Sequence, residues 1–146
     1  MPTFKKSKQT PFHIFELMTA AIVLVMVGIL TTASLIRVSV SCQRLVQETK
    51  GLIDKKKYKQ AYDRLLPYRE TCGESSTKRE DLKNKITRLE FHHNLAVAAY
   101  VVKDKSIAES EADKGLLINQ KLNTSQRQSV PTELTFDMAY VKTGQY

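Results

Sequence analysis

The sequence has few glycines and none of the short motifs that mark the common catalytic sites. Only five glycines occur among 146 residues, and there is no glycine-rich phosphate loop, no G-x-S-x-G and no H-E-x-x-H. Those motifs position phosphate groups, a nucleophilic serine and a catalytic zinc ion, respectively. The sequence therefore predicts a protein that is not an enzyme, needs no cofactor and takes no small-molecule substrate.

The patterns of a metal site and of a nucleic-acid surface are also missing. His92 and His93 are adjacent, so on a helix their side chains point about 100° apart and cannot easily face one ion. We interpret His92 as a surface residue and His93 as a residue at the edge of a core. The net charge is +8, but the basic residues are not mixed with aromatic ones on one face, as nucleic-acid binding requires. A basic excess of this kind is more typical of proteins near anionic lipid headgroups.

Charge is absent from the run between Leu17 and Ile36, LMTAAIVLVMVGILTTASLI. A helix of twenty residues is about 30 Å long, close to the thickness of a bilayer's hydrocarbon core. The run predicts a single transmembrane helix over 12–40, preceded by a basic tail over 1–11. We expect it to be retained as an anchor in the lipid bilayer, because it is longer than the apolar region of a cleaved signal peptide. Candidates for packing inside the membrane are small residues at helical spacing and a carboxylate at the membrane edge: Ala21, Gly28, Thr32 and Glu16.

Amphipathic patterns after the apolar run predict an all-α domain over 41–121. The segment 42–56 and the segment that begins at Tyr58 both show helical spacing of apolar residues, so we expect an antiparallel hairpin that turns near Lys57. A second hairpin is predicted from a helix capped at Ser76 or Thr77 and ending near Val102, a turn, and a partner helix over about 107–120.

The two cysteines, Cys42 and Cys72, lie at equal distances from the predicted turn. Both would then stand at the same end of the first hairpin, where a disulfide is sterically reasonable. Disulfides persist in oxidising compartments such as the bacterial periplasm. The pair therefore favours an N-terminus inside the cell and a domain outside, which places the protein in a bacterial inner membrane with its C-terminal domain in the periplasm. Two free thiols are the alternative.

The second hairpin, NLAVAAYVVKDKSIAESEADKGLLINQ, resembles a tetratricopeptide repeat. Residues at the repeat's characteristic helix positions carry the resemblance: Leu95 and Ala96 in the first helix, Ala108, Gly115 and Leu116 in the second, and Asn119-Gln120 at its end. Tyr58 and Ala61 give a weaker match in the first hairpin, and Ala108 follows Ala61 by more than the usual repeat length. The resemblance implies a helical domain that binds other proteins.

The start of the apolar run resembles the N-terminus of type IV pilins and pseudopilins. Phe12 and Glu16 have the spacing of the first and fifth residues of the processed chain, and a short basic segment precedes them. Pro11 stands where the pilin leader ends in glycine. The resemblance implies cleavage before Phe12 and assembly through the N-terminal helix.

The C-terminal segment 122–146 is predicted to be an extended tail. Leu134, Phe136, Met138 and Tyr140 alternate with less apolar residues, a period of two that is typical of a strand. A single strand is not stable alone, so the tail is expected either to add to a partner's sheet or groove or to fray.

Together these features predict a membrane-anchored protein–protein interaction module, an accessory or assembly subunit of a membrane protein complex. Two alternatives stay open: a pilin-like subunit, and a signal-anchored receptor whose helical-repeat domain faces the cytosol and whose two thiols are free. The candidate partner-binding residues are Tyr58, Tyr62, His92, Tyr100, Phe136 and Tyr140.

Overall fold

A computed structural model describes residues 11–75 and 80–146, with side chains described from residue 41 onward and, before it, at 18, 19 and 21–27. The described chain contains helices and no strand. It divides into two compact units, residues 1–37 and residues 38–146. The predicted basic tail lies outside the described residues apart from Pro11, which begins the first helix.

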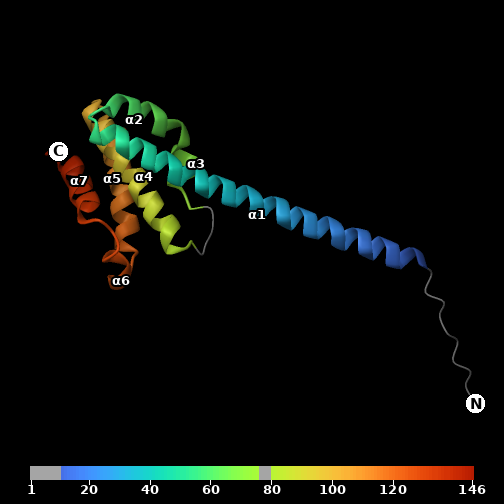
Figure 1. Cartoon of the computed structure of the whole chain (residues 1–146). Coiled ribbons are helices and arrows are strands. Elements are labelled where there is room, and N and C mark those ends of the chain that lie inside the picture. The colour runs from blue at the N-terminus through green and yellow to red at the C-terminus, as the bar shows by residue number, and fades with distance from the viewer. Residues whose placement is uncertain (1–10, 76–79) are drawn as a thin grey trace, which may run out of the picture. The chain divides into compact units, whose positions relative to one another are not determined.

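The first unit contains the N-terminal part of α1 (Pro11–Asp54), drawn in blue in Figure 1. Large apolar side chains from Met18 to Val27 are exposed there. Within the described residues, none of the helices combines the length and the apolar character needed to cross a membrane. The prediction of a transmembrane helix over 12–40 is therefore wrong. The apolar run does not form a separate helix, since α1 continues through polar residues to Asp54.

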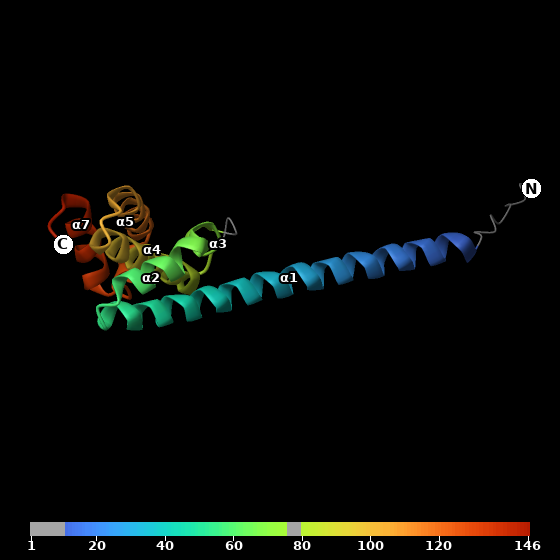
Figure 2. The ribbon, with the colours of Figure 1, turned by 90° about the horizontal axis from the view of Figure 1, so that it is seen from above.

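The second unit is a helical bundle built around one central helix, α4 (Leu82–Val101). The last turns of α1 run beside α2 (Tyr58–Leu65), as both views show (Figures 1 and 2). A short 3-10 turn, η1 (Leu66–Tyr68), and α3 (Arg69–Gly73) continue from α2. Helices α5 (Lys105–Gln120), α6 (Thr124–Arg127) and α7 (Thr132–Thr143) complete the chain. Helices α2, α5 and α7 all pack against α4.

Both predicted hairpin turns are present, and each uses a lysine in the left-handed region. Lys56 (φ 59°) reverses the chain between α1 and α2, and the Lys57 amide donates to the carbonyl of Leu52 at 2.8 Å. Lys103 (φ 66°) does the same between α4 and α5, where Asp104 caps α5 by accepting from the amide of Ile107. The predicted caps of α4, Ser76 and Thr77, lie outside the described residues. Asp81 is its N-cap and accepts from the amide of Asn84 at 2.7 Å.

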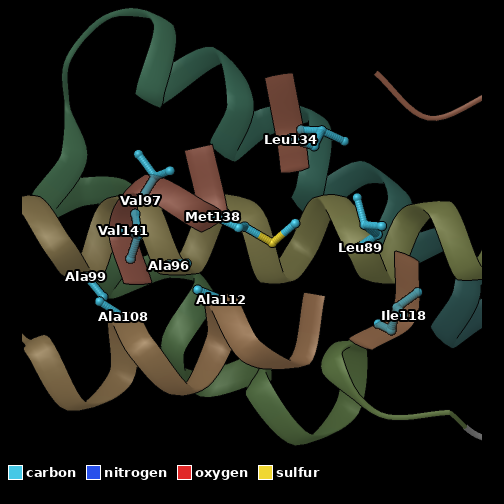
Figure 3. Packing of buried hydrophobic residues seen from close by; sticks show 10 residues of the cluster. All are labelled: Leu89, Ala96, Val97, Ala99, Ala108, Ala112, Ile118, Leu134, Met138 and Val141. Carbon is cyan, nitrogen blue, oxygen red and sulfur yellow. The ribbon is translucent and has the colours of Figure 1, made fainter. Parts of the chain in front are cut away.

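The main core lies where α4, α5 and α7 meet (Figure 3). Alanines face one another from α4 and α5, and small side chains let two helix backbones approach closely. Gly115 extends this pattern: a Cβ at that position would overlap the sulfur of Met138, which fills the space from α7. The labelled core residues of Figure 3 are Leu89, Ala96, Val97, Ala99, Ala108, Ala112, Ile118, Leu134, Met138 and Val141.

The predicted extended tail is wrong, because residues 132–143 form α7 and pack into this core. Leu134, Met138 and Val141 are buried and follow one another by four and three residues, the spacing of a helix face. The apparent alternation arose because Phe136 and Tyr140 are also large, although they stand on the exposed side of the same helix. The unit is thus a bundle around α4 in which both hairpins and α7 pack together, rather than two hairpins followed by a free tail.

Candidate binding sites

A disulfide joins Cys42 of α1 to Cys72 of α3, with the two Cα atoms 5.5 Å apart. Both sulfurs are buried in a second apolar cluster that includes Val46, Leu65 and Phe91. The pairing expected from the symmetrical positions about the first turn is present in the structure. The bridge fixes α3, and with it Gly73, against the rest of the unit.

Gly73 leads directly into a buried polar network centred on His92 and Glu111, which are both almost fully inaccessible to solvent. The ring nitrogen Nδ1 of His92 lies 2.6 Å from Glu111 Oε2, and Nε2 lies 2.9 Å from the carbonyl oxygen of Gly73. Arg69 donates from Nε to Glu111 Oε1 at 2.6 Å and from its terminal nitrogen to Ser110 Oγ at 3.0 Å. The network ties α3, α4 and α5 together.

The surroundings of Glu111 determine its charge. Burial alone would raise the pKa of Glu111, but the hydrogen bond and electrostatic effect of His92, the hydrogen bond from Arg69 and the charge of Lys114 outweigh it and lower the pKa. Glu111 is therefore a carboxylate. The two ring nitrogens of His92 thus face two acceptor groups, the Glu111 carboxylate and the Gly73 carbonyl oxygen. The prediction that His92 is a surface residue available to a partner is wrong, since it holds the bundle together.

His93 makes the equivalent connection toward α7. Its Nε2 lies 2.9 Å from Asp137 Oδ2, and its Nδ1 lies 3.0 Å from Asn94 Oδ1. The Asn94 amide donates in turn to the carbonyl of Val46 and to Thr49 Oγ1, both in α1. His93 is buried, near the position expected for it at the edge of the core. Among the residues that the structure describes, no group of three or more His, Cys, Asp or Glu side chains is arranged to hold a metal ion.

The tyrosines predicted to bind a partner mostly have structural contacts. Tyr58 and Tyr62 are partly buried against the main core. The Tyr62 hydroxyl donates to Asp104 Oδ2 at 2.6 Å; this bond, burial and the nearby carboxylate charges raise the pKa of Tyr62 to about 12, and the same bond lowers the pKa of Asp104. Tyr100 donates to the carbonyl of Gly144 at 2.9 Å.

Phe136 and Tyr140 differ from these tyrosines, because both are largely exposed on α7, at 60% and 49%. They remain available to a partner. Among the residues predicted to pack in a membrane, Ala21 is exposed, and the side chains of Glu16, Gly28 and Thr32 lie outside the part that the structure describes.

An apolar groove of about 640 Å³ opens where the end of α4, the start of α5 and the end of α7 meet. We call this the apolar groove. Tyr100, Val101, Ala108 and Val141 form its walls. Charged side chains also line it: Lys103, Lys105, Lys142 and Glu109. Val101 is 41% exposed.

A second cavity, of about 730 Å³, lies at the other end of the α4–α5 pair. We call this the basic pocket. Four cationic side chains line it: Lys85 and Arg88 from α4, Lys114 from α5 and Lys121 just after α5, with Leu117 and Ile118 as its apolar part. Glu74, Glu80 and the edge of His92 complete the lining, together with Gly73 and Ser75.

Sequence reasoning missed Arg69, Glu111 and the whole basic pocket. Arg69 and Glu111 are separated by 42 residues, and each stands among other charged residues in a stretch that resembles a solvated helix face. One signal was available: Glu111 directly precedes Ala112 and lies three residues after Ala108, so it falls beside the face of α5 that the alanines mark as buried.

No protein-family model, no curated protein and no solved structure matches this chain. The resemblances to tetratricopeptide repeats and to pilin N-termini therefore stay predictions from short motifs.

Proposed function

We propose that the unit 38–146 is a protein–protein interaction module, an accessory or assembly subunit of a larger protein complex, and that its apolar groove receives a segment of the partner. The observation that carries the proposal is the groove itself. It places exposed Val101 beside the side chains of Tyr100 and Val141, at the meeting point of three helices. Concave apolar surfaces of this kind are where a partner's anchoring side chain is buried.

The charges around the groove indicate the chemistry of the partner. Three lysines line the groove against one glutamate. Lys105 is 3.6 Å from Glu109, and Lys142 is 2.6 Å from Asp113. The balance remains positive, so a partner segment with an apolar anchor and flanking acidic residues is complementary to it. The exposed side chains of Phe136 and Tyr140 on α7 extend the apolar surface offered by the unit.

The disulfide supports a location in an oxidising compartment, such as the periplasm. It also counts against the alternative of a receptor domain facing the cytosol, because that alternative expects two free thiols. The proposal concerns the folded unit and includes no transmembrane helix.

The proposal is tested by site-specific photocrosslinking in cells of the source organism. A photoreactive amino acid is placed at Val101 in the groove and, as a matched control, at Leu66, an aliphatic residue of similar exposure in η1. We expect a discrete crosslinked protein from position 101 and not from position 66. The purified partner should then bind the wild-type chain, and Val101→Glu should weaken binding at least tenfold, or about 1.4 kcal/mol.

Leu66→Glu provides the corresponding control for the affinity measurement and should change the dissociation constant less than twofold. Equal loss of binding in both variants, or crosslinks that are identical at the two positions, would show that the groove is not the binding surface. Circular dichroism of each variant checks that the bundle is intact.

A further inference from the structure

The basic pocket is separate from the apolar groove, because α4 and α5 are antiparallel. The groove is formed by the end of α4 and the start of α5, whereas the basic pocket lies between the first half of α4 and the end of α5. Arg88 and Val101 are thirteen residues apart on α4, which corresponds to about 20 Å along a helix. A ligand in the pocket would leave the groove accessible.

The cations of the pocket outnumber its carboxylates by four to two, and the ring of His92 lines it as well. Arg88 is held in place, since its Nε donates to the carbonyl of Gly73 at 3.2 Å and one terminal nitrogen pairs with Glu80. Lys114 is shared between Glu111 at 3.6 Å and Glu74 at 4.0 Å. Within the described part of the chain, no carboxylate lies within ion-pair distance of Lys85 or Lys121.

The arrangement resembles a site prepared for a negative charge. Two lysines without a described counter-charge line the same cavity, Lys85 from α4 and Lys121 from the residue after α5, and a fixed guanidinium lies with them. Bringing like charges together on a folded surface is unfavourable unless an anion offsets it. The cavity also has an apolar part, Leu117 and Ile118. Its volume is in the range of small-molecule sites, roughly 300–1,000 Å³.

We propose that the basic pocket binds a small molecule that carries a doubly charged anionic group, either a phosphate or a pair of carboxylates, and whose less polar part contacts Leu117 and Ile118. Arg88 and Lys114 form the fixed part of the site, and Lys85 and Lys121 close around the anion from either side. This differs from the expectation, based on the missing catalytic motifs, that the chain takes no small molecule, since binding requires none of those motifs.

The test is isothermal titration calorimetry on the full-length chain at constant ionic strength with three probes: inorganic phosphate, phenyl phosphate and succinate. Acetate, a single carboxylate, is the reference. We expect saturable binding of one molecule of at least one dianion, and at least tenfold weaker binding of acetate. Phenyl phosphate binding more tightly than phosphate would indicate the apolar contact, and the phosphate and succinate arms distinguish the two kinds of anion.

The variant Lys85→Ala/Lys121→Ala should weaken dianion binding at least tenfold. Its matched control is Lys55→Ala/Lys57→Ala, which removes the same charge from the exposed turn between α1 and α2. Equal weakening in the two double variants, or no saturable binding of any of the three dianions, would overturn the proposal. So would binding of an acidic peptide by a protein that binds none of the small dianions. None of these four lysines lies in the core, so the variants should remain folded.

Discussion

Removal of the Cys42–Cys72 bridge should destabilise the second unit by a predictable amount. The two cysteines are separated by 30 residues, and closing a loop of that length in the unfolded chain corresponds to about 3.6 kcal/mol at 25 °C in the chain-entropy description. For a unit of this size, that loss would lower the melting temperature by roughly 15 °C. The variant Cys42→Ala/Cys72→Ala should lose somewhat more, because both sulfurs are buried and their removal leaves small cavities.

The assay is urea unfolding of the full-length chain, followed by circular dichroism, in three forms: oxidised wild type, reduced wild type and the double alanine variant. The reduced wild type keeps both sulfurs, so its difference from the oxidised form isolates the effect of the crosslink. Intact mass after thiol alkylation verifies the redox state: the oxidised chain should take up no label, and the reduced chain two.

A difference below about 1 kcal/mol between oxidised and reduced wild type would refute the reasoning, because a 30-residue loop that is truly closed cannot contribute so little unless the unfolded chain is already compact. Labelling of both cysteines without reduction would refute it more directly. It would also return the receptor with a cytosolic domain to consideration.

Three further predictions concern the interior of the bundle. Gly115→Ala should destabilise the unit by about 1–3 kcal/mol, because the added methyl overlaps Met138. Chemical denaturation should show a smaller loss of stability when the same substitution is made in a Met138→Ala background. Additive losses in the double variant would show that the two side chains do not meet. Because the pKa of Glu111 is lowered, its carboxylate stabilises the fold at pH values above the ordinary pKa of a carboxyl group. This stabilisation is lost as the pH falls through the pKa of Glu111 in the folded state. Glu111→Gln should therefore cost about 3–5 kcal/mol at neutral pH and reduce the acid dependence of unfolding, whereas an unchanged acid profile would exclude this role. Hydrogen bonding to Asp104 raises the pKa of Tyr62 to about 12. The protonated Tyr62 hydroxyl therefore stabilises the fold below about pH 10, and this stabilisation is lost between about pH 10 and 12. Alkaline unfolding of Tyr62→Phe should lack that step.

Local patterns predicted the parts of the fold that depend on neighbouring residues. The first hairpin was predictable because Ala61 and Leu65 are both buried on one face of α2, and the cysteine pairing followed from the position of the turn. The face of α5 was predictable from its alanines for the same reason. In each case, burial follows helical spacing, which a sequence displays directly.

The remaining features depend on contacts between distant segments. The large residues of 134–141 fit either a strand or a helix until it is known which of them are buried. Met138 of α7 is buried because Gly115 of α5 leaves room for its side chain. The role of His92 depends on Glu111 and on the carbonyl of Gly73, each 19 residues away in opposite directions. The transmembrane prediction used the hydrophobicity and length of the apolar run, without regard to where the helix that contains the run ends.

The disulfide, the buried network and the basic pocket form one continuous structure through Gly73. Cys72 fixes the preceding residue, and the Gly73 carbonyl then accepts from both His92 Nε2 and Arg88 Nε. A side chain at this position would bring a Cβ within 3.1 Å of the His92 ring, so the close approach favours glycine. The orientation of Arg88 toward the pocket therefore depends on a backbone segment that the disulfide holds in place. Reduction should consequently loosen the proposed anion site as well as the fold, whereas the apolar groove, formed by α4, α5 and α7 alone, should be less affected.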